Sequence, residues 1–149
     1  MSEWKLTHPI VYPTVDCAIF SDRDFKRIYL ARKPGQTKWR FVGGFVDPLD
    51  DSYQSAAIRE AKEETGLDCV VYEWITSAKI EDARYKDKED KIITSLFAMY
   101  SVGDNEPKAM DDICELVLFD FEDLTDDMIV DEHIRIFLSL KAWHRSQYK

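Results

Sequence analysis

No stretch of this 149-residue chain is apolar over the roughly 18 residues that a membrane-spanning helix needs. The first residues, Met1–Lys5, also lack the apolar stretch of a signal peptide. The three cysteines, Cys17, Cys69 and Cys114, are scattered and lack the CxxC spacing typical of a zinc site. We therefore expect buried thiols in a reducing compartment, a cytoplasmic location and no membrane partner.

Positive charge is also scarce, because 20 basic residues face 29 acidic ones and the formal net charge is −9. Such a surface repels phosphate backbones, so we expect no nucleic acid polymer as a partner. The basic residues that do cluster are Arg32, Lys33, Lys38 and Arg40. They indicate either a small anionic substrate or a solvated loop, and the sequence alone leaves both open.

Internal repeats, low-complexity segments and linkers are absent as well. A chain of this length buries about 70% of its unfolded surface in one core. The hydrophobic fraction of 45% is ordinary for a globular protein. We therefore predict a single domain over residues 1–149.

Hydrophobic periodicity predicts strands that alternate with a central helix and a closing helix. The expected strands are Ile10–Phe20, Lys26–Ala31, Trp39–Val42, Cys69–Ile75, Ile92–Tyr100 and Cys114–Phe121. The closing helix is expected over His133–Trp143, where His133 reads as a surface residue. This pattern is typical of a layered α/β domain.

The central helix has recognisable end signals. Asp51 or Ser52 suits its N-cap, and Gln54 falls three residues after Asp51 as in a capping box. Gly66 supplies the left-handed residue that ends a helix. We expect the glutamates of this helix to face outward and a set of apolar residues to face the core: Ala56, Ala57, Ile58 and Ala61.

Glu60, Glu63 and Glu64 share one face of that helix, because their spacing is i, i+3 and i+4. Without a partner, such like-charged pairs cost about 0.2–0.5 kcal/mol each. A hard divalent cation among the oxygens explains the arrangement, since Mg²⁺ prefers oxygen ligands. A solvent-facing helix laced with Arg59 and Lys62 is the alternative, but it does not explain the flanking glycines.

The glycine pair Gly43-Gly44 precedes the helix and allows backbone to come close to a ligand or metal. Within the helix, Arg59 is placed to pair with and orient a carboxylate.

The segment Arg59–Leu67, REAKEETGL, resembles the second half of the Nudix box. The family pattern is Gly, five residues, Glu, seven residues, then Arg-Glu-apolar-x-Glu-Glu-x-Gly-apolar. Ala61 stands where the family usually has a larger apolar residue. In the first half, Asp51 replaces the Glu, and six residues rather than five separate it from Gly44. We interpret this as a one-residue insertion in the preceding loop.

The resemblance implies a mixed β-sheet sandwiched between α-helices. It also implies metal-dependent hydrolysis of a nucleoside diphosphate linked to another moiety, with Mg²⁺ as cofactor and Mn²⁺ as an alternative. Glu60 and Glu64 would be direct metal ligands, and Glu63 would share the metal or act through water. A carbonyl near Gly44 or Phe45 would complete the shell.

A further acid in a later loop orients or deprotonates the attacking water in many family members. Here the candidates are Asp111 and Asp112, with Glu115 next, and each could equally serve loop solvation and turn formation.

The segments Trp39–Pro48, Ala83–Phe97 and Ile129–His133 look similar to Nudix domains that cleave ADP-ribose. An aromatic ring of Trp39, Phe41 or Tyr85 could stack on adenine, and Arg40, Arg84 or Lys86 could pair with phosphate. The leading prediction is hydrolysis of ADP-ribose to AMP and ribose 5-phosphate, by a possible homodimer. The alternatives are another substrate (a dinucleoside polyphosphate, NADH, a nucleotide sugar or an oxidised nucleotide) and a non-catalytic sensor of ADP-ribose.

Overall fold

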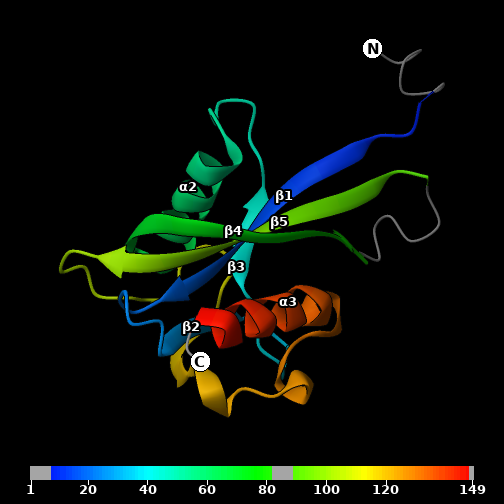
Figure 1. Ribbon diagram of the computed structural model, residues 1–149. Helices are drawn as coiled ribbons and strands as arrows, with labels where there is room; N and C mark the ends of the chain where they lie inside the picture. The colour runs from blue at the N-terminus through cyan, green and yellow to red at the C-terminus, as the bar shows by residue number, and fades with distance from the viewer. Residues whose placement is uncertain (1–7, 82–88, 148–149) are drawn as a thin grey trace.

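A mixed sheet lies between two helices in the computed structural model, which describes residues 8–81 and 89–147 (Figure 1). The strands are β1 (Val11–Phe20), β2 (Arg27–Arg32), β3 (Val42–Phe45), β4 (Asp68–Ile80), β5 (Lys91–Val102) and β6 (Glu115–Asp120). The helices are α2 (Tyr53–Thr65) and α3 (Asp131–Gln147), with two short 3₁₀ turns, η2 (Phe121–Asp123) and η3 (Asp126–Met128).

β1 is the central strand of the sheet, whose order is β4-β5-β1-β2-β6, with β3 also paired to β1. β1 and β5 run parallel, and the other neighbouring strands run antiparallel. The sequence expectation of a mixed sheet is therefore confirmed.

Alternate residues of β1 face opposite helices, as the two-residue period of a strand requires. Val15, Cys17 and Ile19 belong to the core cluster that includes the alanines of α2. Ala18 and Phe20 belong to the cluster that includes the apolar face of α3. The sheet is thus packed on both faces, which confirms the expected sandwich (Figure 1).

The third strand begins later than expected, at Val42 rather than Trp39. Trp39 and Arg40 form only isolated bridges, to Ile129 and Ala31. The continuous ladder to β1 instead runs from Val42 to Phe45 and includes both glycines. β4 extends beyond the expected Cys69–Ile75, because its pairing with β5 continues through two register shifts.

Ser52 is the N-cap of α2, and the prediction of Asp51 with Gln54 as a capping box was wrong. The Ser52 hydroxyl accepts from the Ser55 N–H at 3.0 Å, and the Ser55 hydroxyl accepts from the Ser52 N–H at 3.0 Å. The short serine side chains therefore satisfy both free donors. Gly66 ends the helix as expected, with a φ of 74° and its N–H donated to the Lys62 carbonyl.

Cys17 and Cys69 are buried as expected, but Cys114 is exposed. Its thiol donates to the Arg32 carbonyl at 3.3 Å. This contact lies where β2 ends and β6 begins. Within residues 8–81 and 89–147, neither helix combines the length and the apolar character that a membrane crossing requires.

Candidate active site

The acidic face of α2 is turned toward the sheet, which corrects the expectation that all its glutamates face outward. Glu60 is 8% exposed and Glu64 is 3% exposed, whereas Ile58, expected in the core, is 41% exposed. The buried alanines of α2 pack in one core cluster with Val42 of β3. This packing places the Glu64 carboxyl against Gly43 and the Glu60 carboxyl beside Gly44.

The two glycines of β3 make room for these carboxyl groups. The Gly43 N–H donates to Glu64 Oε1 at 2.7 Å. A Cβ added at Gly44 would lie 2.6 Å from Glu60 Oε1, closer than real contacts allow. Glycine at position 44 is therefore required for the close approach of Glu60.

Burial, together with contact with Asp112 and against the opposing Gly43 N–H, raises the pKa of Glu64 to about 8. This raised pKa favours the protonated Glu64 carboxyl near neutral pH, and the hydrogen bond between the two groups lowers the pKa of Asp112. A cation bound here would displace the Glu64 proton, because carboxylate ligands must be deprotonated.

The loop before β6 brings Asp111 and Asp112 to the same place. The Met110 N–H donates to the Glu64 carbonyl at 3.0 Å and pins the loop to the end of α2. Asp111 adopts a left-handed φ of 58°, a conformation that Asp tolerates better than most residues. One carboxyl oxygen each from Glu64, Asp111 and Asp112 lies within 4.8 Å of the others. Such an oxygen-only donor set fits Mg²⁺.

Arg59 connects the acids of the helix to the preceding loop. Its Nε and Nη2 donate to the two oxygens of Asp50 at 2.9 and 2.8 Å. Its Nη1 donates to Glu60 at 2.9 Å and lies 3.2 Å from the half-exposed Glu63. The fork of bonds from Arg59 lowers the pKa of Asp50 to about 2. Arg59 therefore fixes the positions of several carboxylates at once.

Asp50, rather than Asp51, is the acid of the inserted loop that contacts Arg59. Asp51 is exposed and lies one residue beyond this contact. The inserted residue allows Asp50 to fold back, and its Oδ2 also accepts from the Asp47 N–H at 2.8 Å. The structure therefore makes Asp50 the partner of Arg59, while the interpretation of Asp51 as the substitute for the family Glu stays a prediction.

Replacing Asp50 with Ala should lower kcat by about tenfold or more, because Arg59 loses its bidentate partner. Asp51→Ala, the matched control one residue away, should keep near-native activity and melting temperature. Steady-state assays and thermal melts of both variants measure this. If Asp51→Ala were the more damaging change, the assignment of Asp50 would fail.

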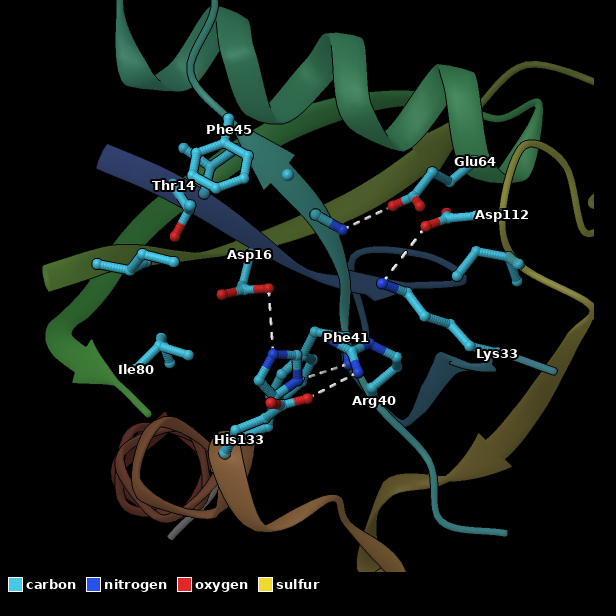
Figure 2. A pocket seen from close by; sticks show the side chains of 16 residues that line it. Thr14, Asp16, Lys33, Arg40, Phe41, Phe45, Glu64, Ile80, Asp112 and His133 are labelled. Carbon is cyan, nitrogen blue, oxygen red and sulfur yellow. Dashed lines mark hydrogen bonds and ion pairs between the residues drawn. The ribbon is translucent and has the colours of Figure 1, made fainter. Parts of the chain in front are cut away.

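A cavity of about 250 Å³ adjoins these acids (Figure 2). Glu64 and Asp112 line one side of it, and the Lys33 ammonium lies 3.4 Å from Asp112 there. On the other side lie Asp16 and His133. The cavity therefore joins a carboxylate cluster to a second, separate polar group.

Arg40 and Phe41 both line this cavity, as the substrate-binding prediction requires. The Arg40 Nη1 donates to Glu132 at 2.8 Å, which holds the guanidinium beside the opening. Phe41 is only 1% exposed, and its ring stacks on His133 at 5.5 Å between centroids. Phe41 therefore supports the wall through His133.

Trp39 lies outside the lining of the cavity. Its ring packs edge-on against Phe119 at 4.9 Å, and the Arg32 guanidinium lies 4.5 Å from the ring centroid. The structure thus gives Trp39 a packing role. The remaining proposed substrate contacts, Arg84, Tyr85 and Lys86, lie outside the described residues.

Asp16 and His133 lie in the site, although neither was predicted there from the sequence. His133 is 2% exposed, against the expectation of a surface residue, because α3 packs its first turn on the sheet. Its Nε2 lies 3.4 Å from Asp16 Oδ1, and the Thr94 hydroxyl donates to Asp16 Oδ2 at 2.5 Å. Burial raises the pKa of Asp16 to about 6. A single acid inside the apolar stretch VYPTVDCAIF was the available signal.

The chain is similar to known proteins along most of its length. The family described as NUDIX domain matches residues 12–140. CTP pyrophosphohydrolase of Escherichia coli K12 is 40% identical over 68 residues, which cover 43% of this chain and only 49% of that protein. ADP-ribose pyrophosphatase of Methanocaldococcus jannaschii is 29% identical over 135 residues, which cover 89% of this chain and 76% of that protein.

Solved structures share the fold at lower identity. The E. coli ORF135 protein has a TM-score of 0.70 and 24% identity, covering 94% of this chain and 95% of its own. The NUDIX domain of Shewanella oneidensis NrtR, solved with ADP ribose, has a TM-score of 0.67 and 16% identity, covering 96% and 98%. At these identities the likeness shows the arrangement of helices and strands alone.

Proposed function

The chain belongs to the NUDIX domain family and is a Nudix pyrophosphohydrolase; we propose that it hydrolyses ADP-ribose to AMP and ribose 5-phosphate. The observation that carries the proposal is the cavity that joins the carboxylate cluster at Glu64 to the cationic side chains of Lys33 and Arg40. The similarity to an ADP-ribose pyrophosphatase over most of the chain supports the choice of substrate.

Nudix hydrolases generally use a divalent metal, and we propose Mg²⁺ here, with Mn²⁺ as a substitute. Glu64, Asp111 and Asp112 would hold it, because their oxygens already converge. Glu60 and Glu63 lie on the same helical face and would join them, with the Gly44 carbonyl as a further ligand. Mg²⁺ bound there would neutralise phosphate oxygens and lower the pKa of water.

The chain's own residues would then divide the remaining work. Lys33 and Arg40 would pair with the negative oxygens of the diphosphate and fix its position. Asp111 or Asp112 would accept a proton from the attacking water. That oxygen bonds to one phosphorus, the bridging P–O bond breaks, and the displaced phosphate leaves with the electron pair. Arg59 would orient Glu60 and Glu63 throughout.

We propose further that residues 1–149 act as one domain in the cytoplasm, on a small nucleotide and not on a polymer. The formal net charge of −9 supports this, because it disfavours a polyanionic partner. The resemblance to dimeric ADP-ribose hydrolases supports a homodimer, which light scattering would test.

A substrate panel tests the function. ADP-ribose, NADH, diadenosine polyphosphates, nucleotide sugars and oxidised deoxynucleotides are each incubated with Mg²⁺ and with Mn²⁺, and products are identified by chromatography. ADP-ribose should exceed every other compound by about tenfold or more in kcat/KM, a difference of about 1.4 kcal/mol, and release AMP. Binding of ADP-ribose without turnover would instead indicate a sensor.

CTP is the second candidate substrate, because a CTP pyrophosphohydrolase is 40% identical to this chain over 68 residues. The same panel therefore includes CTP. Release of CMP from CTP at a higher kcat/KM than AMP from ADP-ribose would replace the proposed substrate and leave the assigned residues unchanged.

A further inference from the structure

Asp16 is a buried acid in the cavity that the proposed reaction leaves without a role. It is 7% exposed and lies on β1, on the face of the sheet that α3 covers (Figure 2). Gly43 separates it from the carboxylate cluster, since a Cβ at Gly43 would lie 2.7 Å from Asp16 Oδ1, while the Gly43 N–H binds Glu64. Asp16 is thus close to the cluster but outside it.

The hydrogen bonds around Asp16 fix its orientation. The Phe41 N–H donates to His133 Nδ1 at 3.1 Å, so the proton of the neutral imidazole is on Nε2. Burial and the nearby positive charge of Arg40 hold the pKa of His133 well below its usual value. The neutral ring therefore directs an N–H at Asp16 Oδ1 over 3.4 Å, while the Thr94 hydroxyl donates to Oδ2. Each oxygen retains a lone pair that can accept another bond.

Charge decides which part of a nucleotide can lie beside Asp16. With a pKa near 6, its carboxyl is ionised above that pH and repels phosphate oxygens. Lys33 and the carboxylate cluster lie toward the other side of the cavity. A bound nucleotide therefore directs its phosphates toward Lys33 and an uncharged group toward Asp16.

The walls near Asp16 fit a flat, apolar ring. Phe45, Ile80 and Ile92 line this part of the cavity, and the ring of Phe45 is 38% exposed. A sugar has hydroxyl groups all round, and such walls would leave most of them without partners. A nucleobase places its faces against apolar side chains and needs polar partners only at its edge.

We propose that Asp16 is a specificity-determining residue that accepts a hydrogen bond from an exocyclic amino group of the substrate's nucleobase, an inference that rests on the proposed function. Adenine and cytosine both carry such a group. Hypoxanthine and uracil carry a carbonyl oxygen at the same position, which a carboxylate repels. The ring N–H of each lies directly beside that carbonyl oxygen, so a carboxylate that approaches the N–H also meets the oxygen it repels.

The test measures binding of nucleoside monophosphates and so does not depend on turnover. Isothermal calorimetry with Mg²⁺ gives dissociation constants for the pairs AMP and IMP, and CMP and UMP. The native protein should bind the amino member of at least one pair about tenfold more tightly or better, as a hydrogen bond to a charged group implies. Asp16→Asn should reduce that preference to about threefold or less, because one acceptor oxygen becomes an N–H donor.

Glu132→Gln is the matched control, since it removes one negative charge from the same cavity without a contact to Asp16. It should change the affinity for both members of a pair equally. If Asp16→Asn fails to fold, Thr94→Val is the second variant. It removes only the hydrogen bond from the Thr94 hydroxyl to Asp16, and it should still reduce the ratio of the dissociation constants within a pair.

The proposal fails if the native protein shows no preference in either pair, binds no monophosphate, or keeps its preference after Asp16→Asn. Failure of ADP-ribose hydrolysis in the substrate panel is a separate result. If ADP-ribose is not hydrolysed, an amino preference of the native protein in either pair that Asp16→Asn removes still supports the role of Asp16.

Discussion

Glu64→Gln should lower kcat by about a thousandfold or more while the protein remains folded. The change removes the negative charge of a proposed metal ligand, and about 4 kcal/mol of barrier corresponds to that factor. Gln can still accept the hydrogen bond that the Gly43 N–H donates to Glu64 at 2.7 Å, so the contact between α2 and β3 is kept. Steady-state kinetics at saturating Mg²⁺ provide the measurement.

The fold of this variant should be at least as stable as that of the native protein at pH 8. The folded pKa of Glu64, about 8, exceeds the ordinary value of 4.5, so the folded state holds a proton that the unfolded state releases. Stability from this group is therefore full below pH 4.5 and is lost as the pH rises toward 8. A neutral Gln avoids the loss, and thermal melts at pH 5 and pH 8 would show it.

The number of protons released when Mg²⁺ binds distinguishes a metal ligand at Glu64 from a residue with a structural role alone. Near pH 7, binding of Mg²⁺ to the native protein should release up to about one proton, because Glu64 must ionise. Glu64→Gln should release fewer, as measured by calorimetry in buffers of different ionisation enthalpy. Glu73→Gln, at an exposed position of β4, is the matched control and should release as many protons as the native protein. Near-native turnover of Glu64→Gln would remove Glu64 from the metal site.

Alanine at Gly43 and at Gly44 should damage the protein in two different ways. A Cβ at Gly43 would lie 2.1 Å from the Val15 carbonyl oxygen and 3.0 Å from the Asp16 Cα, both backbone atoms of the paired strand. Relief requires β3 to move away from β1, so we expect a loss of about 3 kcal/mol in the free energy of unfolding. Urea denaturation would measure it.

At Gly44 the three atoms nearest to the added Cβ, at 2.6–2.7 Å, all belong to the carboxyl group of Glu60. That group is the flexible end of a side chain and can rotate away. The free energy of unfolding should therefore change by about 1 kcal/mol or less, while kcat falls about a hundredfold because a proposed ligand is displaced. Each variant controls for the other. Equal stability losses, or full activity of Gly44→Ala, would contradict this account of the glycines.

Local signals in the sequence predicted the elements that depend on short-range interactions. Gly66 ends α2 in a left-handed conformation, which glycine adopts without the steric strain of a side chain. This preference belongs to the residue itself and can be read from the sequence. The mostly apolar run Ile92–Tyr100 predicted β5, because a strand between two packed faces needs apolar residues on both sides. The resemblance to the Nudix box then supplied the mixed sheet between helices, which periodicity could not.

The sequence by itself also determined that Glu60, Glu63 and Glu64 share one helical face, because helix geometry fixes that spacing. Only the tertiary structure decided that Glu60 and Glu64 are buried against the glycines of β3. It likewise decided that Asp50 rather than Asp51 binds Arg59, and that His133 meets Asp16 across 117 residues of chain (133 − 16). Such contacts depend on which segments the sheet brings together. Local preferences of the chain do not predict contacts between residues so far apart in the sequence.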